Sequence, residues 1–194
     1  MKKVCNVIIL VLVIVAIVIS VIIFNKYMEN YQNEKKKDNL ISEINSKLGD
    51  LNTDENREMP YIEYEGYQVI GIIKIEKINL LYPILNVNNE DSMKKSITKF
   101  YGDKLNQEGN VTLAGHNNFD GTMFGKLKDL EIGDKITILD LNNHSITYEI
   151  FNKYVTDPND VSIVNSTKEG IKEITLVTCT NGNKNRLIIK AKEV

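Results

Sequence analysis

The chain has 194 residues, of which 42% are hydrophobic, and its formal net charge is −2. This near-neutral balance provides no basic surface for nucleic acid, so we expect no nucleic-acid partner. Once an apolar N-terminus and a linker are set aside, about 130 residues remain, which suffices for one domain with a core but not for two.

Residues 1–24 predict a short cytoplasmic tail followed by a membrane anchor. The run from Val4 to Phe24 contains no charged residue. As a helix, these roughly 21 residues span about 31 Å, which matches a bilayer core of about 30 Å. The flanking Phe24-Asn25-Lys26 offers no small-residue cleavage site, so we expect an uncleaved, single-pass anchor in the cell membrane. Lysines lie on both sides of the run, and only the shortness of the N-terminal tail favours an extracytoplasmic location for the rest of the chain.

Residues 25–60 are rich in Asn, Lys and Glu and predict an extracytoplasmic stalk. A solvated coil is the favoured interpretation of this stalk. A short helix remains the alternative, because apolar residues recur at helical spacing at Leu40, Ile41, Ile44, Leu48 and Leu51.

Residues 61–194 predict a single domain of many short strands. Two local hairpins stand out, and the second surrounds Asn181-Gly182-Asn183, a strong turn signal. Helical turns are expected at 91–99 and 122–130. The expected strands are 68–75, 80–85, 110–115, 135–140, 144–156, 173–178 and 186–192. Short strands separated by turns at this spacing indicate an all-β barrel or sandwich.

Three chemically suited side chains are expected at strand ends. Cys179 ends the run TLVTC, His116 ends the run TLAGH, and Arg186 lies at the start of the last strand. Cys5 lies in the predicted membrane span and cannot pair with Cys179, which leaves a free thiol in an exported domain.

A thiol, an imidazole and a guanidinium are the groups that cysteine acyl transfer needs. At pH 7 an ordinary thiol is about 3% thiolate and an ordinary imidazole about 24% protonated, and proximity favours both charged forms. Cys179 could then attack a carbonyl while His116 protonates the leaving amine. Arg186 could stabilise the oxyanion, since its guanidinium is always charged and offers five N–H groups. Taken singly, each residue has an ordinary structural interpretation, and it is the combination that favours catalysis.

The residues TLVTC with Arg186 downstream, together with LAGH and the run IGIIKIEKINLLYPI, resemble the sortase family of Gram-positive bacteria. The resemblance covers about residues 66–194. It implies a closed eight-stranded sortase-type β-barrel with short helices and a membrane-anchored cysteine transpeptidase. By this likeness Cys179 is the nucleophile, His116 the general acid and base, and Arg186 the oxyanion or substrate stabiliser.

The same resemblance implies cleavage of an LPxTG-like sorting motif between Thr and Gly. The partners would be secreted proteins that carry the motif, and the acceptor would be an amine on a peptidoglycan precursor or another protein. An Asp-Pro-aromatic lid and a second membrane span are not expected, and the stretch from Thr156 to Glu173 is short. These features favour a class A or D type over class B or C.

Binding residues are expected along the strand that ends at Cys179 and in the preceding connection. An extended peptide would place its apolar side chain near Val177, Thr178, Ile163 and Val164. No cofactor and no metal site are predicted, because no His/Cys spacing is typical of zinc. A solvated turn is the favoured interpretation of Asn88–Asp91 and a site for a calcium modulator is the alternative, since this loop lacks a dense cluster of carboxylates.

Two rival functions remain open. One is a cysteine peptidase that hydrolyses the same thioacyl intermediate, and the other is a non-catalytic peptide-binding module. The complete set of Cys, His and Arg argues against the second, but the sequence does not separate hydrolysis from transfer.

Overall fold

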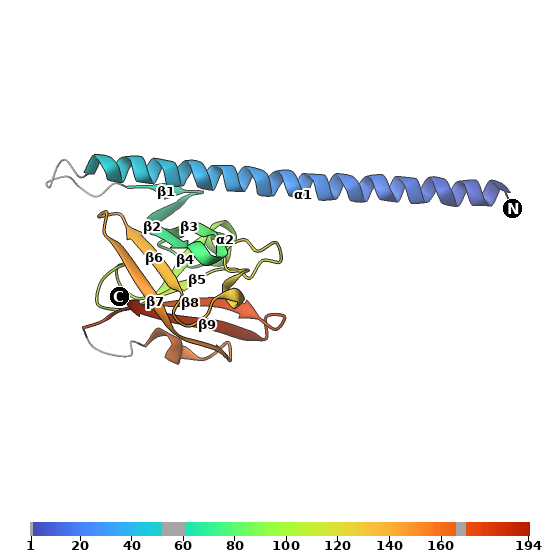
Figure 1. Ribbon diagram of the computed structural model, residues 1–194. Coiled ribbons are helices and arrows are strands. Elements are labelled where there is room, and N and C mark those ends of the chain that lie inside the picture. The colour runs from blue at the N-terminus through green and yellow to red at the C-terminus, as the bar shows by residue number, and fades with distance from the viewer. Residues whose placement is uncertain (1, 52–60, 166–169) are drawn as a thin grey trace. The chain divides into compact units, whose positions relative to one another are not determined.

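The computed structural model describes residues 2–51, 61–165 and 170–194 of the chain (Figure 1). These fall into two compact units, residues 1–40 and residues 41–194. The C-terminal part of the predicted stalk, residues 52–60, lies outside the described residues.

The N-terminal unit belongs to helix α1 (Lys2–Leu51), which continues without a break through most of the predicted stalk. The favoured prediction of a solvated coil over this stretch is wrong. No proline or glycine interrupts the sequence before Gly49, and Glu43 pairs with Lys47 one turn later at 2.6 Å. The coil prediction rests on the polar composition of the stretch, but an exposed helix also tolerates polar residues.

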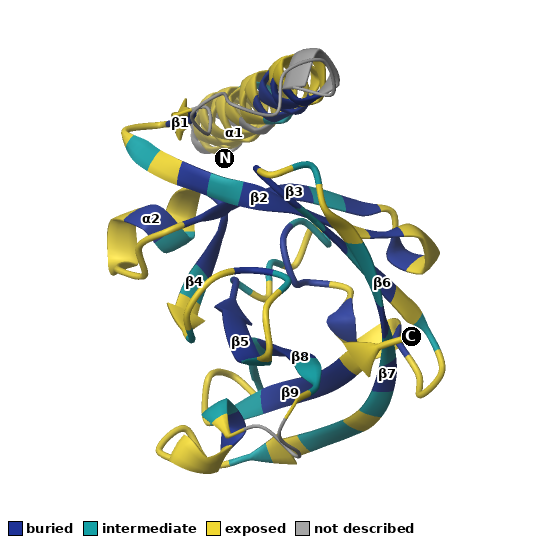
Figure 2. Ribbon diagram, turned by 90° about the vertical axis from the view of Figure 1, so that its left-hand side faces the viewer, coloured by how far each residue is buried: buried dark blue, intermediate teal, exposed yellow. Residues whose placement is uncertain are grey.

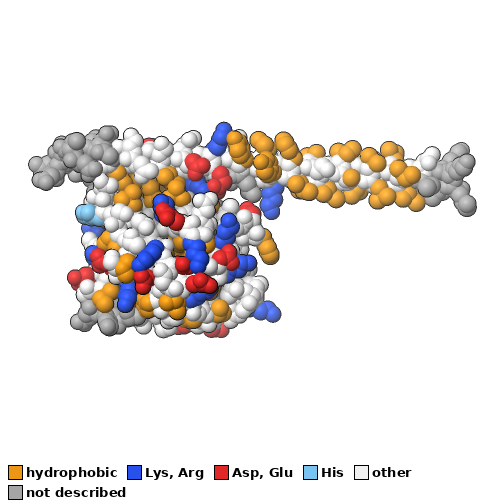
Figure 3. Space-filling view, viewed as in Figure 1, with side chains coloured by type: hydrophobic (Ala, Val, Ile, Leu, Met, Phe, Trp, Pro, Cys, Tyr) orange, Lys and Arg blue, Asp and Glu red, His pale blue; other side chains and the backbone are white. Residues whose placement is uncertain are grey.

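Exposed apolar side chains cover the N-terminal part of α1 (Figure 3). One 18-residue window of this helix reaches a mean hydropathy of 3.4, and none of that window is buried. Among the described residues, α1 is the one helix long and apolar enough to cross a membrane. It is consistent with the predicted anchor.

The last part of α1 belongs to the second unit. Here Ile41, Ile44 and Leu48 are buried, while Ser42 and Ser46 between them are exposed. The helical spacing over Ile41–Leu48 therefore marks an amphipathic helix with a buried stripe.

Eight strands of the second unit form a closed barrel. Around the ring the order is β2-β3-β4-β5-β8-β9-β7-β6, and β6 pairs back with β2. A two-residue strand, β1, is attached to β2. The bounds are β1 Glu63–Tyr64, β2 Tyr67–Ile75, β3 Leu80–Leu85, β4 Ile97–Tyr101, β5 Gly109–Ala114, β6 Lys135–Asp140, β7 Ser145–Thr156, β8 Lys172–Thr180 and β9 Asn185–Glu193. The predicted closed eight-stranded β-barrel is thus confirmed.

The barrel is mixed, because two of its pairings are parallel and the others antiparallel. β3 runs parallel to β4, and β5 runs parallel to β8. The short helices are α2 (Glu90–Lys95) and three 3₁₀ turns, η1 (Glu76–Ile78), η2 (Leu127–Asp129) and η3 (Val161–Val164).

Buried residues recur along the barrel strands (Figure 2), and the core is formed by strand side chains that face the inside of the ring. Ile174 and Leu176 of β8 belong to it, as do Leu187 and Ile189 of β9. Because side chains alternate along a strand, the odd-numbered residues of β8 face outward. This alternation decides which side of the barrel Cys179 occupies.

Two predicted helical stretches differ from the structure. The first, residues 91–99, is helical as far as the end of α2 at Lys95, but its residues 97–99 belong to strand β4, where β-branched Ile97 and Thr98 are fully buried in the sheet. In the second, residues 122–130, Met123 has a positive φ, and only the turn η2 is helical. Its apolar residues at three-residue spacing, including Phe124 and Leu127, fill the barrel core rather than one face of an α-helix.

Candidate active site

The β8–β9 hairpin places Cys179 directly opposite Arg186. The carbonyl of Val177 accepts a bond from Gly115 of the neighbouring chain segment, so alternate residues of β8, including Cys179, direct their backbone polar groups toward β5. Cys179 and Arg186 therefore form a non-hydrogen-bonded antiparallel pair. In such pairs the Cα atoms are about 4.5 Å apart and the side chains, on the same face, are at their closest.

The turn of this hairpin follows from its sequence. Asn181, Gly182 and Asn183 all have positive φ, a region that Gly and Asn enter most readily. The local turn sequence therefore sets the register that places Cys179 and Arg186 opposite each other.

Strand β5 brings His116 to the same end of the barrel. β5 pairs with β8 in parallel as far as Ala114 opposite Val177, and the backbone N–H of Gly115 then donates to the carbonyl of Val177 at 3.2 Å. His116 is the next residue, and its carbonyl accepts a bond from the N–H of Phe124 at 2.9 Å. The parallel register thus joins the strand ends that carry His116 and Cys179.

Gly115 faces the core and has no space for a side chain. A Cβ added there would lie 2.6 Å from Cδ1 of Ile97 and 2.9 Å from Cδ2 of Phe124. The residue before His116 is therefore glycine for a packing reason.

Two further bonds connect the segments that carry the thiol and the imidazole. The hydroxyl of Thr178 donates to the carbonyl of Gly115 at 2.7 Å, and the side-chain amide of Asn117 donates to the carbonyl of Cys179 at 2.8 Å. His116 and Cys179 are both partly exposed. A substrate can therefore reach both residues, while their backbones are held in place.

Arg186 is also partly exposed. Its Nη1 donates to the carbonyls of Asn183 and Asn185, each at 3.2 Å. These bonds hold one guanidinium nitrogen against the hairpin.

The predicted binding residues separate into two groups. Val177 is half-buried on the outer face, whereas Thr178 is buried, alternates to the opposite face and supports Gly115. Ile163 and Val164 lie in η3, which packs on β5. Ile163 is bonded to Asn110 near the start of β5, whereas Val177 pairs with Ala114 at the end of that strand.

Two polar side chains, neither of which the sequence suggested, hold η3 and the residue that follows it. The amide of Asn110 donates to the carbonyl of Ile163 at 3.1 Å, and the ammonium of Lys190 donates to the carbonyl of Asn165 at 2.7 Å. At the start of the same connection, hydrogen bonds from Ser162 and Thr156 lower the pKa of Asp160, and the charge of Lys190 acts in the same direction. The connection is thus fixed by groups on β5 and β9.

The loop considered for calcium uses its side chains internally. Asn88 accepts a bond from Thr98, Asn89 caps α2, and Glu90 and Asp91 pair with Lys94. Among the described residues, no group of three His, Cys, Asp or Glu side chains is arranged to hold a metal ion.

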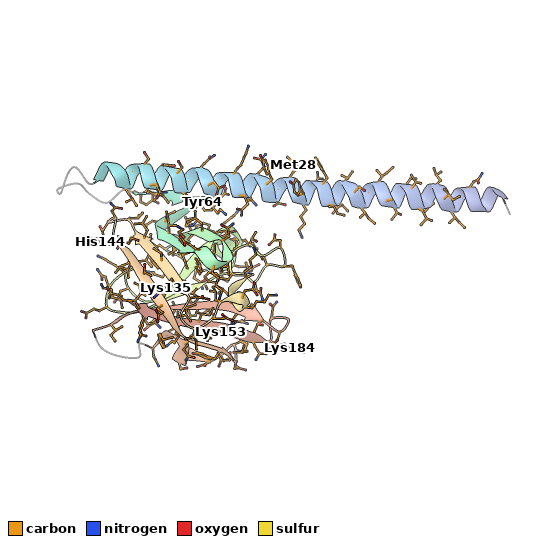
Figure 4. The ribbon with its side chains drawn as sticks, viewed as in Figure 1. Met28, Tyr64, Lys135, His144, Lys153 and Lys184 are labelled. Atoms are coloured by element: carbon orange, nitrogen blue, oxygen red, sulfur yellow. The ribbon has the colours of Figure 1, made fainter. Side chains whose placement is uncertain are left out.

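A cavity of about 440 Å³ lies away from the predicted catalytic residues, and none of them lines it. Its lining includes Val69, Leu105 and His144, which come from the end of the barrel where β5 begins. Figure 4 shows His144 and Lys184, which belongs to the β8–β9 turn, at opposite ends of the barrel. The imidazole Nδ1 of His144 lies 3.6 Å from a carboxylate oxygen of Asp140.

Comparison with known proteins gives a consistent result. The sequence matches the family model for the sortase domain over residues 73–194. Sortase D of Bacillus subtilis is 31% identical over 131 residues, which cover 66% of this chain and 62% of that protein. Sortase A of Listeria monocytogenes is 30% identical over 117 residues, which cover 60% of this chain and 51% of that protein. The chain thus spans less than two thirds of the length of either relative.

Solved structures agree with the sequence matches. A Clostridium perfringens sortase D5 transpeptidase aligns with a TM-score of 0.63 and 30% identity, over 84% of this chain and 98% of that one. Sortase C1 of Streptococcus agalactiae aligns with a TM-score of 0.59 and 30% identity, over 65% of this chain and 67% of that one.

Proposed function

The chain belongs to the sortase family, and on this premise we propose that it is a membrane-anchored cysteine transpeptidase. The observation that carries the proposal is the meeting of three strand ends: Cys179 opposite Arg186, with His116 on the segment bonded alongside. No other part of the described chain brings a free thiol next to an imidazole-bearing segment.

In the proposed reaction, Cys179 as thiolate attacks the carbonyl carbon between Thr and Gly of an LPxTG-like motif. A C–S bond forms, and Arg186 stabilises the negative charge on the carbonyl oxygen. The C–N bond then breaks as His116 gives a proton to the departing amine, which leaves a thioester on Cys179.

In the second half of the reaction His116 acts as a base and Cys179 is the leaving group. An amine on a peptidoglycan precursor or another surface protein attacks the thioester, and His116 accepts its proton. The new amide bond forms as the thiolate of Cys179 departs, which regenerates the enzyme.

The outer face between η3 and Cys179 is the proposed peptide groove. Val177 and Ala114 form its floor, and Ile163 and Val164 are the proposed contacts for the apolar motif residue. Thr178 serves this groove from below through its bond to Gly115. A Bacillus sortase D at 31% identity and a Listeria sortase A at 30% both support a class A or D type.

The N-terminal helix supports a membrane location. We propose residues 1–24 as tail and anchor, residues 25–60 as stalk and residues 61–194 as the catalytic barrel outside the membrane. Within the stalk, residues 41–51 belong to the folded second unit. Protease added to intact cells should then remove the barrel. A barrel that is cleaved only after lysis would contradict this orientation.

The test of activity uses the full chain in detergent micelles. We would incubate it with a panel of sorting-motif peptides, with and without amine acceptors, and follow the products by mass spectrometry. An adduct on Cys179 together with a ligated product is expected, and Cys179→Ala should give neither.

Other outcomes distinguish the rivals. Cleavage without ligation, for every acceptor tried, would favour the hydrolase. Peptide binding without any adduct on Cys179 would favour the binding module.

A further inference from the structure

Asn117, the residue after His116, makes an unusual contact for an exposed side chain. Its amide Nδ2 donates to the backbone carbonyl of Cys179 at 2.8 Å, across 62 residues of sequence. One residue therefore connects the imidazole-bearing segment to the backbone of the nucleophile itself.

The contact replaces a hydrogen bond that β5 would make to β8 if the strand continued to residue 117. In a parallel ladder, every second residue of one strand donates to a carbonyl of its neighbour, at even spacing. Gly115 donates to Val177 at 3.2 Å, so the next donor along β5 would be the backbone N–H of residue 117, and its acceptor would be the carbonyl of Cys179. In the structure β5 ends at Ala114, and the side chain of Asn117 supplies that donor instead.

This substitution frees the backbone to turn. Asn117 forms an isolated bridge with Met123, and the N–H of Phe124 donates to the carbonyl of His116. The chain can thus leave the sheet at His116 while the Cys179 carbonyl keeps a hydrogen-bond partner. Without the amide, that carbonyl would lose its link to the segment that carries His116.

We propose that Asn117 is a positioning residue for the proposed transpeptidase: its amide fixes the distance between the thiol of Cys179 and the imidazole of His116. The inference rests on the proposed function for its catalytic meaning. The structural part of the inference is that Asn117 couples the thiol of Cys179 to the imidazole of His116. This part is testable without any peptide substrate.

The test compares Asn117→Ala and Asn117→Asp in the full chain, with Asn118→Ala as the matched control. Asp has nearly the same shape as Asn, but its carboxylate cannot donate a hydrogen bond. Asn118 lies in the same turn, and its amide donates to Thr122 at 2.9 Å rather than to Cys179.

Two readouts are used. The first is the pH profile of Cys179 alkylation by iodoacetamide, quantified by mass spectrometry on the peptide that contains Cys179. The second is the rate of motif-peptide turnover. Both Asn117 variants should shift the alkylation profile and lower kcat by about 10- to 100-fold with KM within about 2-fold, since small misplacements of reacting groups cost this much. Asn118→Ala should change neither readout.

The outcomes are separable. A wild-type alkylation profile in both Asn117 variants would overturn the positioning role, as would full turnover by Asn117→Asp. Equal losses of kcat and of Tm in the Asn117 and Asn118 variants would show that the contact only stabilises the turn. This result would also overturn the positioning role. If the wild-type protein turns over no peptide, the proposed function fails, while the alkylation profiles still decide the role of Asn117.

Discussion

At the scale of single residues, the proposed chemistry depends on side chains whose backbones are tightly constrained. Cys179 and Arg186 share a cross-strand position, and Gly115 allows the His116 segment to pack against the core. The residue types were recognisable from the sequence, because TLVTC and LAGH end predicted strands. The supporting bonds of Thr178 and Asn117 were not recognisable, because their partners are carbonyl groups of distant residues.

Arg186 provides a direct test of oxyanion stabilisation. Arg186→Ala should lower kcat by about 10²- to 10³-fold, the cost of removing one such donor group. Arg186→Lys keeps the charge but not the planar fork of donors, so it should recover only part of the loss. Steady-state turnover of the motif peptide is the measurement, with the exposed Lys184→Ala in the same turn as control. Turnover in Arg186→Ala equal to that of the control would remove Arg186 from the mechanism.

Gly115→Ala tests the packing behind His116. The added methyl group would meet Ile97 and Phe124 below normal contact distance, so we expect a loss of about 1–3 kcal/mol in unfolding free energy. Combining it with Ile97→Val removes the Cδ1 atom nearest the new methyl group. Denaturant unfolding should show that the double variant is less destabilised than the sum of the single changes; strict additivity would contradict the proposed clash.

At the scale of elements, the site depends on the β8–β9 hairpin, on the parallel pair of β5 and β8, and on the η3 connection, which groups on β5 and β9 hold in place. The hairpin is local and was predicted from its Asn-Gly-Asn turn, which the structure realises with positive φ. β4 was missed because its short run of β residues follows directly on a helical turn. The sequence predicts the η3 connection only as a source of binding residues, whereas the structure shows that Asn110 and Lys190 hold it in place.

Lys190→Met tests whether this connection shapes the groove. Loss of the bond to Asn165 should loosen the η3 segment and raise KM for the motif peptide about 3- to 10-fold with kcat within about 2-fold, since binding and not chemistry is affected. Lys192→Met, an exposed position on the same face of β9, is the control. Equal KM values for the two variants would show that the ammonium of Lys190 does not shape the groove.

At the scale of the whole molecule, the second unit combines a closed barrel with the last turns of α1. Ile44 is completely buried, which indicates that this part of the helix adds to the folded unit rather than serving as a spacer. The spacing of apolar residues over Leu40–Leu51 predicts such an amphipathic helix, but the polar composition around it favours a coil.

Ile44→Ala should lower the unfolding free energy of the barrel unit by about 2–5 kcal/mol, as for other large buried aliphatic residues. Ser46→Ala, exposed half a turn away, should change it by less than about 0.5 kcal/mol. Thermal unfolding of both variants in detergent is the measurement. Equal stabilities for the two variants would mean that the helix does not contribute to the unit.

Features that depend on composition and near neighbours could be predicted from the amino-acid sequence alone. These are the apolar anchor run, the hairpins set by turn residues, and the presence of Cys179, His116 and Arg186 at strand ends. The tertiary structure decided how β2 closes on β6, how β5 lies parallel to β8, and how Asn117 takes the place of a backbone donor. The physical reason is that turn and hydropathy signals act over a few residues. The register of strands far apart in the chain is instead fixed by packing the whole core at once.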